Sequence, residues 1–280
     1  MITRILRNLP PFKGKHRLAR VLLNRRIQNE KESIVHGKLD CSYRLPNVKE
    51  NIGFEILING IYELETIRFV ERKLLEGDVF IDIGANIGAI SIPVCKLRSD
   101  ISTMSIEAAP WIFTYLEENV KITKVSNITL INKAMSDSDM EQVDFFSPRD
   151  KFGKGSLAPV FTTDAVSVQT ITLDRLAEKC NGKRIGLIKV DVEGFEMLVF
   201  KGGPLLLGNL QSPDILFEFV EWAERLAGVE VGSAQVLLQR FGYSLYLFEK
   251  GEVSRKLTDP MVSGSCLIFA TKENFTSPAK

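Results

Sequence analysis

From residue 78 onward, the chain alternates short apolar segments with amphipathic segments at regular intervals. The apolar segments resemble strands buried on both faces of a sheet; they are DVFIDI, ISTMSIE, NITLINKAM, SVQTITL, IGLIKVDVEG, DILFEF and a closing pair, YSLYLF and SCLIFA. The helix-like segments between them are ANIGAISIPVCKL, PWIFTYLEENVKI with Pro110 in its first turn, LDRLAEKC, FEMLVFKG and AQVLLQRFG. This order predicts a doubly wound α/β fold, a mostly parallel sheet with helices on both faces.

Residues 1–60 precede this pattern and predict an N-terminal extension. SIVHG and IGFEILI are short β-like pieces that predict an accessory hairpin. YELETIRFVERKLLEG then has the period of an amphipathic helix, which Gly77 ends. We therefore expect a basic helical and β extension over residues 1–60, a Rossmann-like domain over 61–272 and a tail over 273–280.

The first 29 residues contain eight Lys or Arg and no acid, which leaves 28 bases against 35 acids, a net charge of −7, on the remainder. Within them, HRLARVLLNRRIQ places Leu18, Val21 and Leu22 on one helical face, with Leu23 and Ile27 adjoining. This basic arm is either a docked helix with a solvated basic face, a contact for an anionic membrane or glycolipid, or a nucleic-acid contact. The acidic body argues against nucleic acid.

The cysteine and histidine content favours reduced thiols and no zinc site. Cys41, Cys95, Cys180 and Cys266 are far apart, and the histidines are His16 and His36. No run of about 18 apolar residues is present, and the first residues have no signal-peptide pattern. We expect a cytoplasmic protein.

The stretch VFIDIGANIG contains a glycine-rich turn between a strand and a helix. Its order is Asp82-x-Gly84-x-Asn86-x-Gly88, which fits neither the dinucleotide fingerprint nor the phosphate-binding loop with its lysine. Asn86 brings a side chain to the point where a pyrophosphate would approach the backbone most closely. S-adenosylmethionine fits better, because it has no phosphate and carries a cationic sulfonium and a ribose diol. A purely structural turn is the alternative reading.

Acidic residues follow several of the predicted strands: Asp82, Glu107, Asp191, Glu193 and Glu218. The carboxyl ends of parallel strands share one edge of a sheet, which is where ligands bind. Glu107 lies 25 positions after Asp82, where an acid on the second strand reaches a ribose diol. We expect Glu107 to bind the ribose.

Lys189 and Asp191 alternate in IKVDVEG and therefore point to the same face of their strand. A buried lysine needs a partner, and Asp191 or Glu218 is available. The cluster is either a structural ion pair or a group of acids that orients an acceptor hydroxyl and takes its proton. Gly194 would end the strand and leave room for a substrate.

In their order, VFIDIGANIGAISI, IEAAPWIFTYLEENV, TLDRL, IGLIKVDVEGFEMLVFKGG and DILFEF resemble the FkbM-type S-adenosylmethionine-dependent methyltransferases, over roughly residues 78–220. The combination of D-x-G-A-N-x-G with K-x-D-V-E-G-x-E carries the resemblance. It implies a class I methyltransferase fold with a seven-stranded sheet of order 3-2-1-4-5-7-6, whose last strand is antiparallel. It also implies O-methylation of sugars, glycolipids or natural products, with S-adenosylhomocysteine as the product.

The resemblance also implies roles for individual residues. The cofactor contacts would be Asp82, Gly84, Ala85, Asn86 and Gly88 at the turn, Glu107 and Ala108 at the ribose, Ser136 or Asp137 at the adenine, and Asp191 near the methyl group. The catalytic group would be Lys189, Asp191, Glu193 and Glu218. Ala89 departs from the aromatic residue of many members, and the first 60 and last 30 residues fall outside the pattern.

The absence of two motifs argues against other types of methylation. DVEG stands where N-methyltransferases have N/D-P-P-Y/F, and Cys95 and Cys180 are not at predicted strand ends, as a C5-methylating nucleophile would be. Asp191, Glu193 and Glu218 could resemble the Mg²⁺ ligands of catechol-type enzymes, but we expect no metal.

The loop 147–159 has the glycines and charges of a lid, and its Lys151, Lys154 and Ser156 could meet an acceptor; an ordinary solvated loop is the alternative. Trp111 and Trp222 are read as packing residues, with sugar stacking as the alternative.

These observations predict an S-adenosylmethionine-dependent O-methyltransferase for a hydroxylated small-molecule or glycan acceptor. A non-catalytic Rossmann-like nucleoside-binding protein and an RNA methyltransferase are the alternatives. No oligomeric state is predicted.

Overall fold

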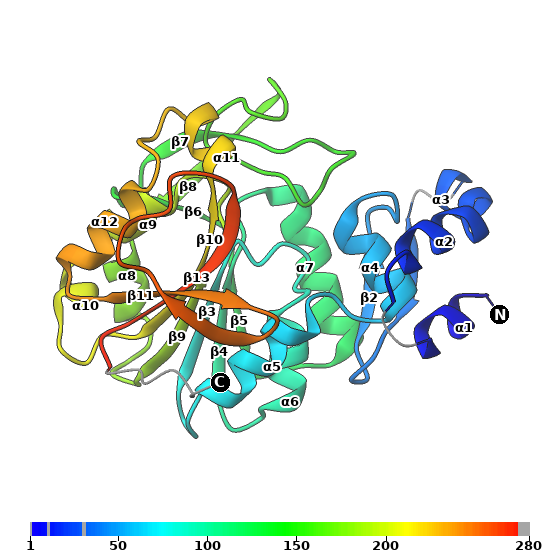
Figure 1. The fold of residues 1–280 in the computed structure, drawn as a ribbon, viewed down its shortest axis with the longest axis horizontal. Coiled ribbons are helices and arrows are strands. Elements are labelled where there is room, and N and C mark those ends of the chain that lie inside the picture. The colour runs from blue at the N-terminus through cyan, green and yellow to red at the C-terminus, as the bar shows by residue number, and fades with distance from the viewer. Residues whose placement is uncertain (1, 10–11, 30–31, 274–280) are drawn as a thin grey trace.

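The protein is described by a computed structural model over residues 2–9, 12–29 and 32–273 (Figure 1). Its centre is an eight-stranded sheet with the order β12-β11-β13-β10-β9-β3-β4-β5. The strands are β3 (Val79–Ile83), β4 (Ser102–Ile106), β5 (Ile128–Ile131), β9 (Ile185–Val190), β10 (Asp214–Val220), β11 (Ser244–Glu249), β12 (Glu252–Lys256) and β13 (Ser265–Thr271).

Five strands, β5, β4, β3, β9 and β10, run parallel, and β13 is antiparallel to both β10 and β11. Without β12, the order of the strands is the predicted one, so the class I methyltransferase fold is confirmed. The eighth strand, β12, pairs with β11 at the edge of the sheet and was not predicted.

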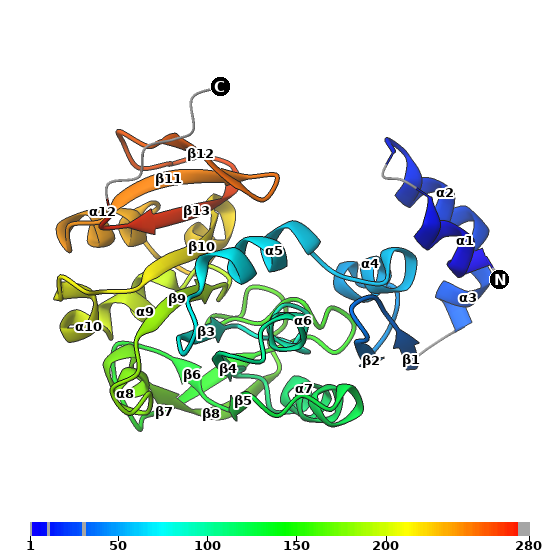
Figure 2. The same cartoon turned by 90° about the horizontal axis from the view of Figure 1, so that it is seen from below.

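Helices cover both faces of the sheet, as Figure 2 shows. They are α5 (Leu64–Lys73), α6 (Ser91–Leu97), α7 (Pro110–Thr123), α8 (Leu173–Glu178), α9 (Glu196–Lys201), α10 (Pro204–Gly208), α11 (Glu221–Leu226) and α12 (Ser233–Arg240). Alternation along β3 divides two apolar cores. Val79, Ile81 and Ile83 belong to the core with α8, α9 and α12, whereas Phe80 belongs to the core with α5 and α6.

A second, three-stranded sheet has the order β6-β8-β7, with β6 (Ala134–Met135), β7 (Gln142–Phe146) and β8 (Ala165–Ile171). The prediction of one strand for NITLINKAM is therefore wrong, because its two halves pair with different partners, β5 with β4 and β6 with β8. The predicted helix after β3 begins only at Ser91, since residues 85–90 form the turn.

The N-terminal extension contains α1 (Ile2–Asn8), α2 (Lys15–Leu22), α3 (Asn24–Asn29), β1 (Ser33–His36), β2 (Ser42–Leu45) and α4 (Asn51–Asn59). A hairpin is present, but the prediction that IGFEILI forms one of its strands is wrong: β1 pairs with β2, and IGFEILI lies in α4. The carboxylate of Glu50 accepts the amide of Ile52 at the start of α4, and left-handed Gly60 ends the helix.

The extension packs against the sheet domain. Phe54 and Ile56 of α4 share one apolar cluster with Ile87, Ile92 and Ile112. The domain boundary at residue 60 stays a prediction, and the tail apart from Glu273 lies outside the described residues. Over the part of the chain that the structure covers, no helix is both long and apolar enough to cross a bilayer.

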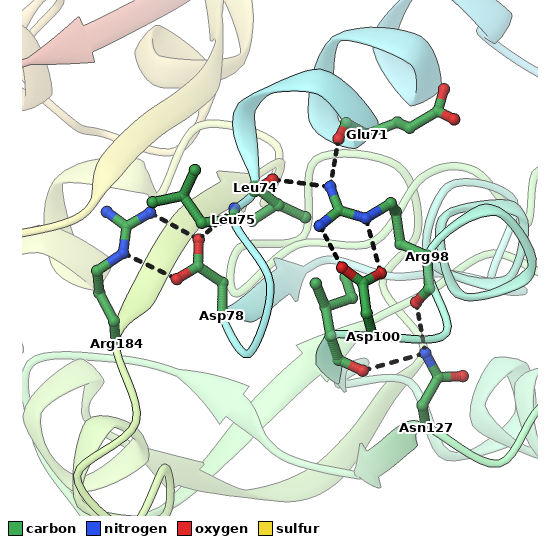
Figure 3. A network of polar contacts seen from close by, with 9 residues as sticks. Glu71, Leu74, Leu75, Asp78, Arg98, Asp100, Asn127 and Arg184 are labelled. Carbon is green, nitrogen blue, oxygen red and sulfur yellow. Dashed lines mark hydrogen bonds and ion pairs between the residues drawn. The ribbon is translucent and has the colours of Figure 1, made fainter.

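The amino-terminal edge of the parallel strands is held by a polar network (Figure 3). The carboxylate of Asp78, just before β3, accepts two hydrogen bonds from Arg184, at 2.8 and 2.6 Å, and one from the amide of Leu75. Arg98 pairs with Asp100 and donates to the carbonyls of helix α5 and its end. This edge is filled by the protein itself, whereas the opposite edge carries the predicted site.

Candidate functional site

The turn after β3 is shaped by its glycines. Gly84 has φ 76°, and a Cβ there would lie 1.9 Å from the carbonyl oxygen of Asp191. Only glycine therefore lets the ends of β3 and β9 approach so closely. Gly88 has φ 83° and is packed against Ile92 and Leu116, so it serves the turn rather than a cavity.

Asn86 connects the turn to two other segments. It has φ 52°, and its backbone N–H donates to Glu107 Oε2 at 2.9 Å. Its side-chain Nδ2 donates to the carbonyl of Phe152, in the loop 147–159, at 2.6 Å. Asparagine adopts this left-handed backbone and, unlike glycine, has a side-chain amide that holds the loop over the turn.

Glu107 follows β4 and is 6% exposed. Its carboxylate accepts the amides of Asn86 at 2.9 Å and Ala109 at 2.8 Å. Burial raises the pKa of Glu107 to about 7, although both amides oppose this shift. The group is thus a fixed hydrogen-bond acceptor whose charge changes near neutral pH.

The first cleft lies beside Glu107 and holds about 690 Å³, counting space open to solvent. Of the predicted cofactor contacts, Gly84, Asn86, Glu107, Ala108 and Asp191 line it. Ser136 and Asp137 do not; the preceding residues, Lys133, Ala134 and Met135, do.

The apolar walls of the first cleft were missed from the sequence. They include Phe145 of β7 and Phe152, Gly153 and Leu157 of the loop 147–159. Phe152 is fully buried in the cluster that joins the extension to the sheet domain. The sequence signal was Phe145 just before the charged loop and Phe152 within it, which the lid interpretation did not use.

A cluster of charged side chains lies where β3, β9 and β10 run side by side. Asp82 of β3 is in register with Lys189 of β9. Lys189 Nζ donates to Asp191 Oδ2 at 3.2 Å and lies 4.0 Å from Asp82 Oδ1. Asp191 is therefore the partner that the sequence left open between Asp191 and Glu218.

Glu193 and Glu218 complete this cluster. Single carboxylate oxygens of Asp191, Glu193 and Glu218 lie within 4.8 Å of one another. Glu193 Oε1 accepts from Lys154 Nζ at 2.6 Å. The loop 147–159 thus contributes a cation to the acids, while Lys151 is exposed and Ser156 pairs with Phe146.

Burial and mutual repulsion move the pKa values of these groups apart. Burial, then the charge of Asp191, raises the pKa of Glu193 to about 7 and that of Glu218 to about 9. Burial raises the pKa of Asp82 as well. Burial disfavours the ionised form of Asp191, but the positive charge of Lys189 outweighs this effect and lowers the pKa of Asp191. Burial likewise disfavours the ionised form of Lys189, but the negative charges of Asp191 and Asp82 outweigh this effect and raise the pKa of Lys189.

The second cleft is lined by this cluster and by the start of α4. It holds about 910 Å³, again including open space. Predicted residues on it are Asp82, Gly84, Ala85, Asn86, Lys189, Asp191, Glu193 and Glu218, joined by Lys154. The two clefts share Gly84, Asn86, Asp191 and Glu193, so they meet at the ends of β3 and β9.

Three further predicted positions lie elsewhere. The expectation that Gly194 leaves room for a substrate is wrong, because a Cβ there would lie 2.8 Å from the backbone of Ala223 in α11. Trp111 donates to Ser147 Oγ at 3.1 Å. Trp222 packs edge-on against Phe161, and Lys154 lies 5.8 Å from each of these two rings.

Comparison with known proteins gives a match to the family described as methyltransferase FkbM domain, over residues 82–245. The chain is 30% identical to the hexuronic acid methyltransferase AglP of Haloferax volcanii over 141 residues, 50% of this chain and 56% of AglP. It is 25% identical to the tRNA(Phe) (4-demethylwyosine(37)-C(7)) aminocarboxypropyltransferase of Methanocaldococcus jannaschii, over 42% of this chain and 44% of that protein. The chain thus spans about half the length of the curated relatives it matches.

Among solved structures, the chain is similar to a precorrin-6y C5,15-methyltransferase from Geobacter metallireducens, with a TM-score of 0.44 and 14% identity over 75% of this chain and 88% of that one. It is also similar to M. jannaschii TYW2 in complex with AdoMet, with a TM-score of 0.41 and 17% identity over 86% of this chain and 85% of that one.

Proposed function

The chain belongs to the FkbM methyltransferase family, and we propose that it transfers a methyl group from S-adenosylmethionine to a hydroxyl of a sugar, glycolipid or natural-product acceptor. S-adenosylhomocysteine is the second product. One observation carries this proposal: two clefts of different character meet at Gly84, Asn86, Asp191 and Glu193. One cleft suits a nucleoside, and the other is lined by groups that handle a hydroxyl.

The first cleft is the proposed cofactor site. Glu107 is fixed by two backbone amides and can accept hydrogen bonds from the ribose diol. We assign the adenine to the wall that contains Ala134 and Met135, rather than to Ser136 or Asp137, because only the former line the cleft. The absence of a phosphate-binding glycine pattern supports a nucleoside without phosphate.

The second cleft is the proposed acceptor site. Methyl transfer is an in-line displacement, in which the acceptor oxygen forms a bond to the methyl carbon as the bond to sulfur breaks. Positioning can supply up to about 7–11 kcal/mol, and a general base about 10²–10⁴-fold. Lys189 holds Asp191 where it can orient the hydroxyl. Glu193, whose pKa is raised by burial to about 7, is the candidate base. Glu218, whose pKa is raised to about 9, holds its proton near neutral pH and can donate a hydrogen bond.

Two variants test the enzyme against a non-catalytic nucleoside-binding protein. Asp191→Asn and Glu218→Gln should keep binding S-adenosylhomocysteine and lose methyl transfer to an acceptor found by screening hydroxylated glycans. Unchanged turnover in both variants would remove the catalytic assignment. Nucleoside binding without turnover on any acceptor would favour the alternative.

The class of acceptor is supported by the name of one relative, a hexuronic acid methyltransferase. A second relative is named as a tRNA-modifying transferase, so RNA is the competing acceptor. RNA binding depends steeply on salt because phosphate contacts release counterions. Retention of RNA with a steep salt dependence would favour the RNA methyltransferase, and methylation of a glycan without it would favour the sugar enzyme.

We also propose that the protein is cytoplasmic and touches an anionic membrane surface through its basic arm. Large apolar side chains on α1, α2 and their connection are exposed: Ile5 55%, Phe12 44%, Leu18 41%, Val21 70% and Leu22 48%. Inward-facing Ala19, Leu23 and Ile27 are buried instead. Figure 2 has these helices at the edge of the molecule, away from the sheet. An apolar face beside arginines and lysines suits anionic lipid.

Vesicle co-sedimentation tests this contact. Binding to phosphatidylcholine vesicles should require added phosphatidylglycerol and should fall with salt. Val21→Asp should weaken it, whereas Leu210→Asp should not, because Leu210 is 93% exposed at a distant loop. Equal effects of the two variants, or no binding to anionic vesicles, would contradict it.

A further inference from the structure

The second cleft holds more carboxyl groups than its lysines can pair. The groups of the cluster are Asp82, Asp191, Glu193 and Glu218 on one side and Lys154 and Lys189 on the other, four carboxyl groups against two ammonium groups. Glu50 and Glu63 also line the cleft, but they accept from Ile52 N and from Thr66 Oγ1. The excess therefore belongs to the cluster at the strand ends.

The lysines leave free oxygens on this cluster. Lys189 donates to Asp191 Oδ2 and Lys154 donates to Glu193 Oε1. Each of these carboxylates therefore keeps a second oxygen that is not bonded to a lysine. Glu193 is 6% exposed, and its Oε2 is buried with no hydrogen-bond partner among the described residues. No ion pair of Glu218 with a lysine or arginine is found over the same residues. Glu218, which keeps its proton near neutral pH, can donate one hydrogen bond to Asp191, and Glu193 Oε2 is then still without a donor.

Asp82 gives a second, independent indication of a missing partner. It is 1% exposed and lines the same cleft, and neither of its carboxylate oxygens makes a hydrogen bond of normal geometry in the described part of the chain, although Ser91 lies close enough to oppose the rise in its pKa. Lys189 Nζ, its nearest cation, is 4.0 Å away. A buried carboxylate without a donor is costly, and a ligand that brings donors or positive charge would remove that cost.

We propose that Asp191, Glu193 and Glu218 bind a divalent metal ion of the Mg²⁺ and Mn²⁺ class in the second cleft. Three converging carboxylates are ligands that hard divalent ions prefer, and Mg²⁺ commonly keeps several waters beside one or two carboxylates. Asp82 would serve as an acceptor for donors that such an ion brings into the cleft. This site replaces the expectation from the sequence that no metal is used.

The site deepens the proposed function and rests on it for its chemistry. An ion there would make the acceptor hydroxyl more acidic, and its charge would favour the ionised form of Glu218. The hydroxyl oxygen bonds to the methyl carbon, the electron pair of the broken carbon–sulfur bond stays on sulfur, and the cofactor product is S-adenosylhomocysteine. The hydroxyl proton would pass to an oxygen of ionised Glu218, which pairs with no lysine.

Metal binding can be measured without cofactor or acceptor. Electron paramagnetic resonance of the full chain with Mn²⁺ should give one bound ion, displaced by Mg²⁺, with a dissociation constant below about 1 mM. Asp191→Asn and Glu218→Gln should each weaken binding at least about tenfold, as loss of a ligand charge does. Glu221→Gln is the matched control, because Glu221 pairs with Arg225 outside the cleft.

Lys154→Gln distinguishes an ion site from simple structural damage. It frees Glu193 Oε1 and removes a competing positive charge, so Mn²⁺ should bind several times more tightly. A folding defect would weaken binding instead. If Asp191→Asn fails to fold, Lys154→Gln and Glu218→Gln still decide the matter.

Three results would overturn the site: no Mn²⁺ bound by the unmodified chain, weaker binding in Lys154→Gln, or an equal loss in Glu221→Gln. Titration with S-adenosylhomocysteine is run on the same samples. Binding of the nucleoside without Mn²⁺ would support the proposed function and contradict the metal site. Binding of Mn²⁺ without the nucleoside would support the metal site and contradict the proposed function.

Discussion

Glu107 shows how one residue can combine a structural and a ligand role. Its two oxygens accept the amides of Asn86 and Ala109, which fixes the turn after β3 to the end of β4. Both are neighbours in space only because β3 and β4 are parallel and adjacent. The sequence predicted this contact region from a spacing of 25 residues, and Glu107 lines the first cleft as that prediction requires.

Binding of S-adenosylhomocysteine should depend on the charge of Glu107. Burial raises the pKa of Glu107 to about 7. The ionised form accepts hydrogen bonds from the ribose, so affinity should rise as pH increases from 6 to 8. Glu107→Gln should remove this rise and weaken binding by about 1.5–3 kcal/mol, the size of a hydrogen bond to a charged group.

Calorimetric titrations in the presence of a metal chelator measure this dependence. Glu193→Gln is the control, because the pKa of Glu193 is also raised by burial to about 7. If the rise disappears in Glu193→Gln and persists in Glu107→Gln, the ribose assignment is wrong.

At the scale of helices and strands, the sequence predicted buried parallel strands well and short apolar segments poorly. Strands such as β3 and β9 are apolar on both faces, and their flanking glycines and acids mark the ends. IGFEILI is almost as apolar, and periodicity alone cannot distinguish a buried strand from a buried helix. The caps Glu50 and Gly60 decide it in favour of α4, and both can be read from the sequence.

Other elements could not be predicted because long-range pairing creates them. β6 has only two residues, and it is a strand because Ala134 and Met135 pair with Thr170 and Ile171. The first cleft depends on a second long-range pairing, of β7 with β8, which places Phe145 and the loop 147–159 beside the ends of β3 and β4. The residues next to these segments in the sequence do not predict that contact.

The polar network before β3 should affect stability and leave the site intact. Asp78→Ala removes the partner of Arg184 and the acceptor of the Leu75 amide at a position that is 2% exposed. It should lower the free energy of unfolding by about 1.5–3 kcal/mol, the size of hydrogen bonds to a charged group, because Arg184, which is left behind, is half exposed. Urea denaturation measures this loss.

The affinity for S-adenosylhomocysteine in Asp78→Ala should stay unchanged, because Asp78 precedes β3 whereas the proposed site follows the carboxyl end of that strand. Arg184→Ala should also destabilise the fold, because it leaves the buried carboxylate of Asp78 with the amide of Leu75 but without its cation. If Asp78→Ala were as stable as the original chain, or if it no longer bound S-adenosylhomocysteine, the separation of a stabilising edge from a binding edge would be wrong.

In the molecule as a whole, one edge of the sheet is filled by the protein's own polar side chains and the other gathers acids around two clefts. Burial raises the pKa values of Glu107, Glu193, Glu196 and Glu218 to between about 7 and about 9. In the unfolded chain these groups ionise near about pH 4.3. The folded protein therefore binds more protons than the unfolded chain over this pH interval. Because these protons must be removed from the folded protein as pH rises, the buried acids lower its stability at higher pH.

Stability without ligand should consequently fall as pH rises. The stabilising contribution of these groups is fully present below about pH 4.3 and is lost as pH passes their folded pKa values. The melting temperature should be higher at pH 5.5 than at pH 8.5, by at least about 2 °C. Differential scanning calorimetry in the presence of a chelator measures it.

Glu196→Gln should reduce this difference. Burial raises the pKa of Glu196 to about 8, and glutamine keeps an oxygen to accept the amide of Val192. Exposed Glu178→Gln should leave it unchanged. A melting temperature that increases from pH 5.5 to pH 8.5 would show that these acids are not held as the fold implies.

Calorimetric titration with S-adenosylhomocysteine tests most directly whether the rim of acids forms a nucleoside site without phosphate. One molecule should bind per chain, Glu107→Gln should weaken it, and NAD and ATP should give no heat of binding under the same conditions. A flat titration with S-adenosylhomocysteine, or binding of NAD in its place, would contradict the account.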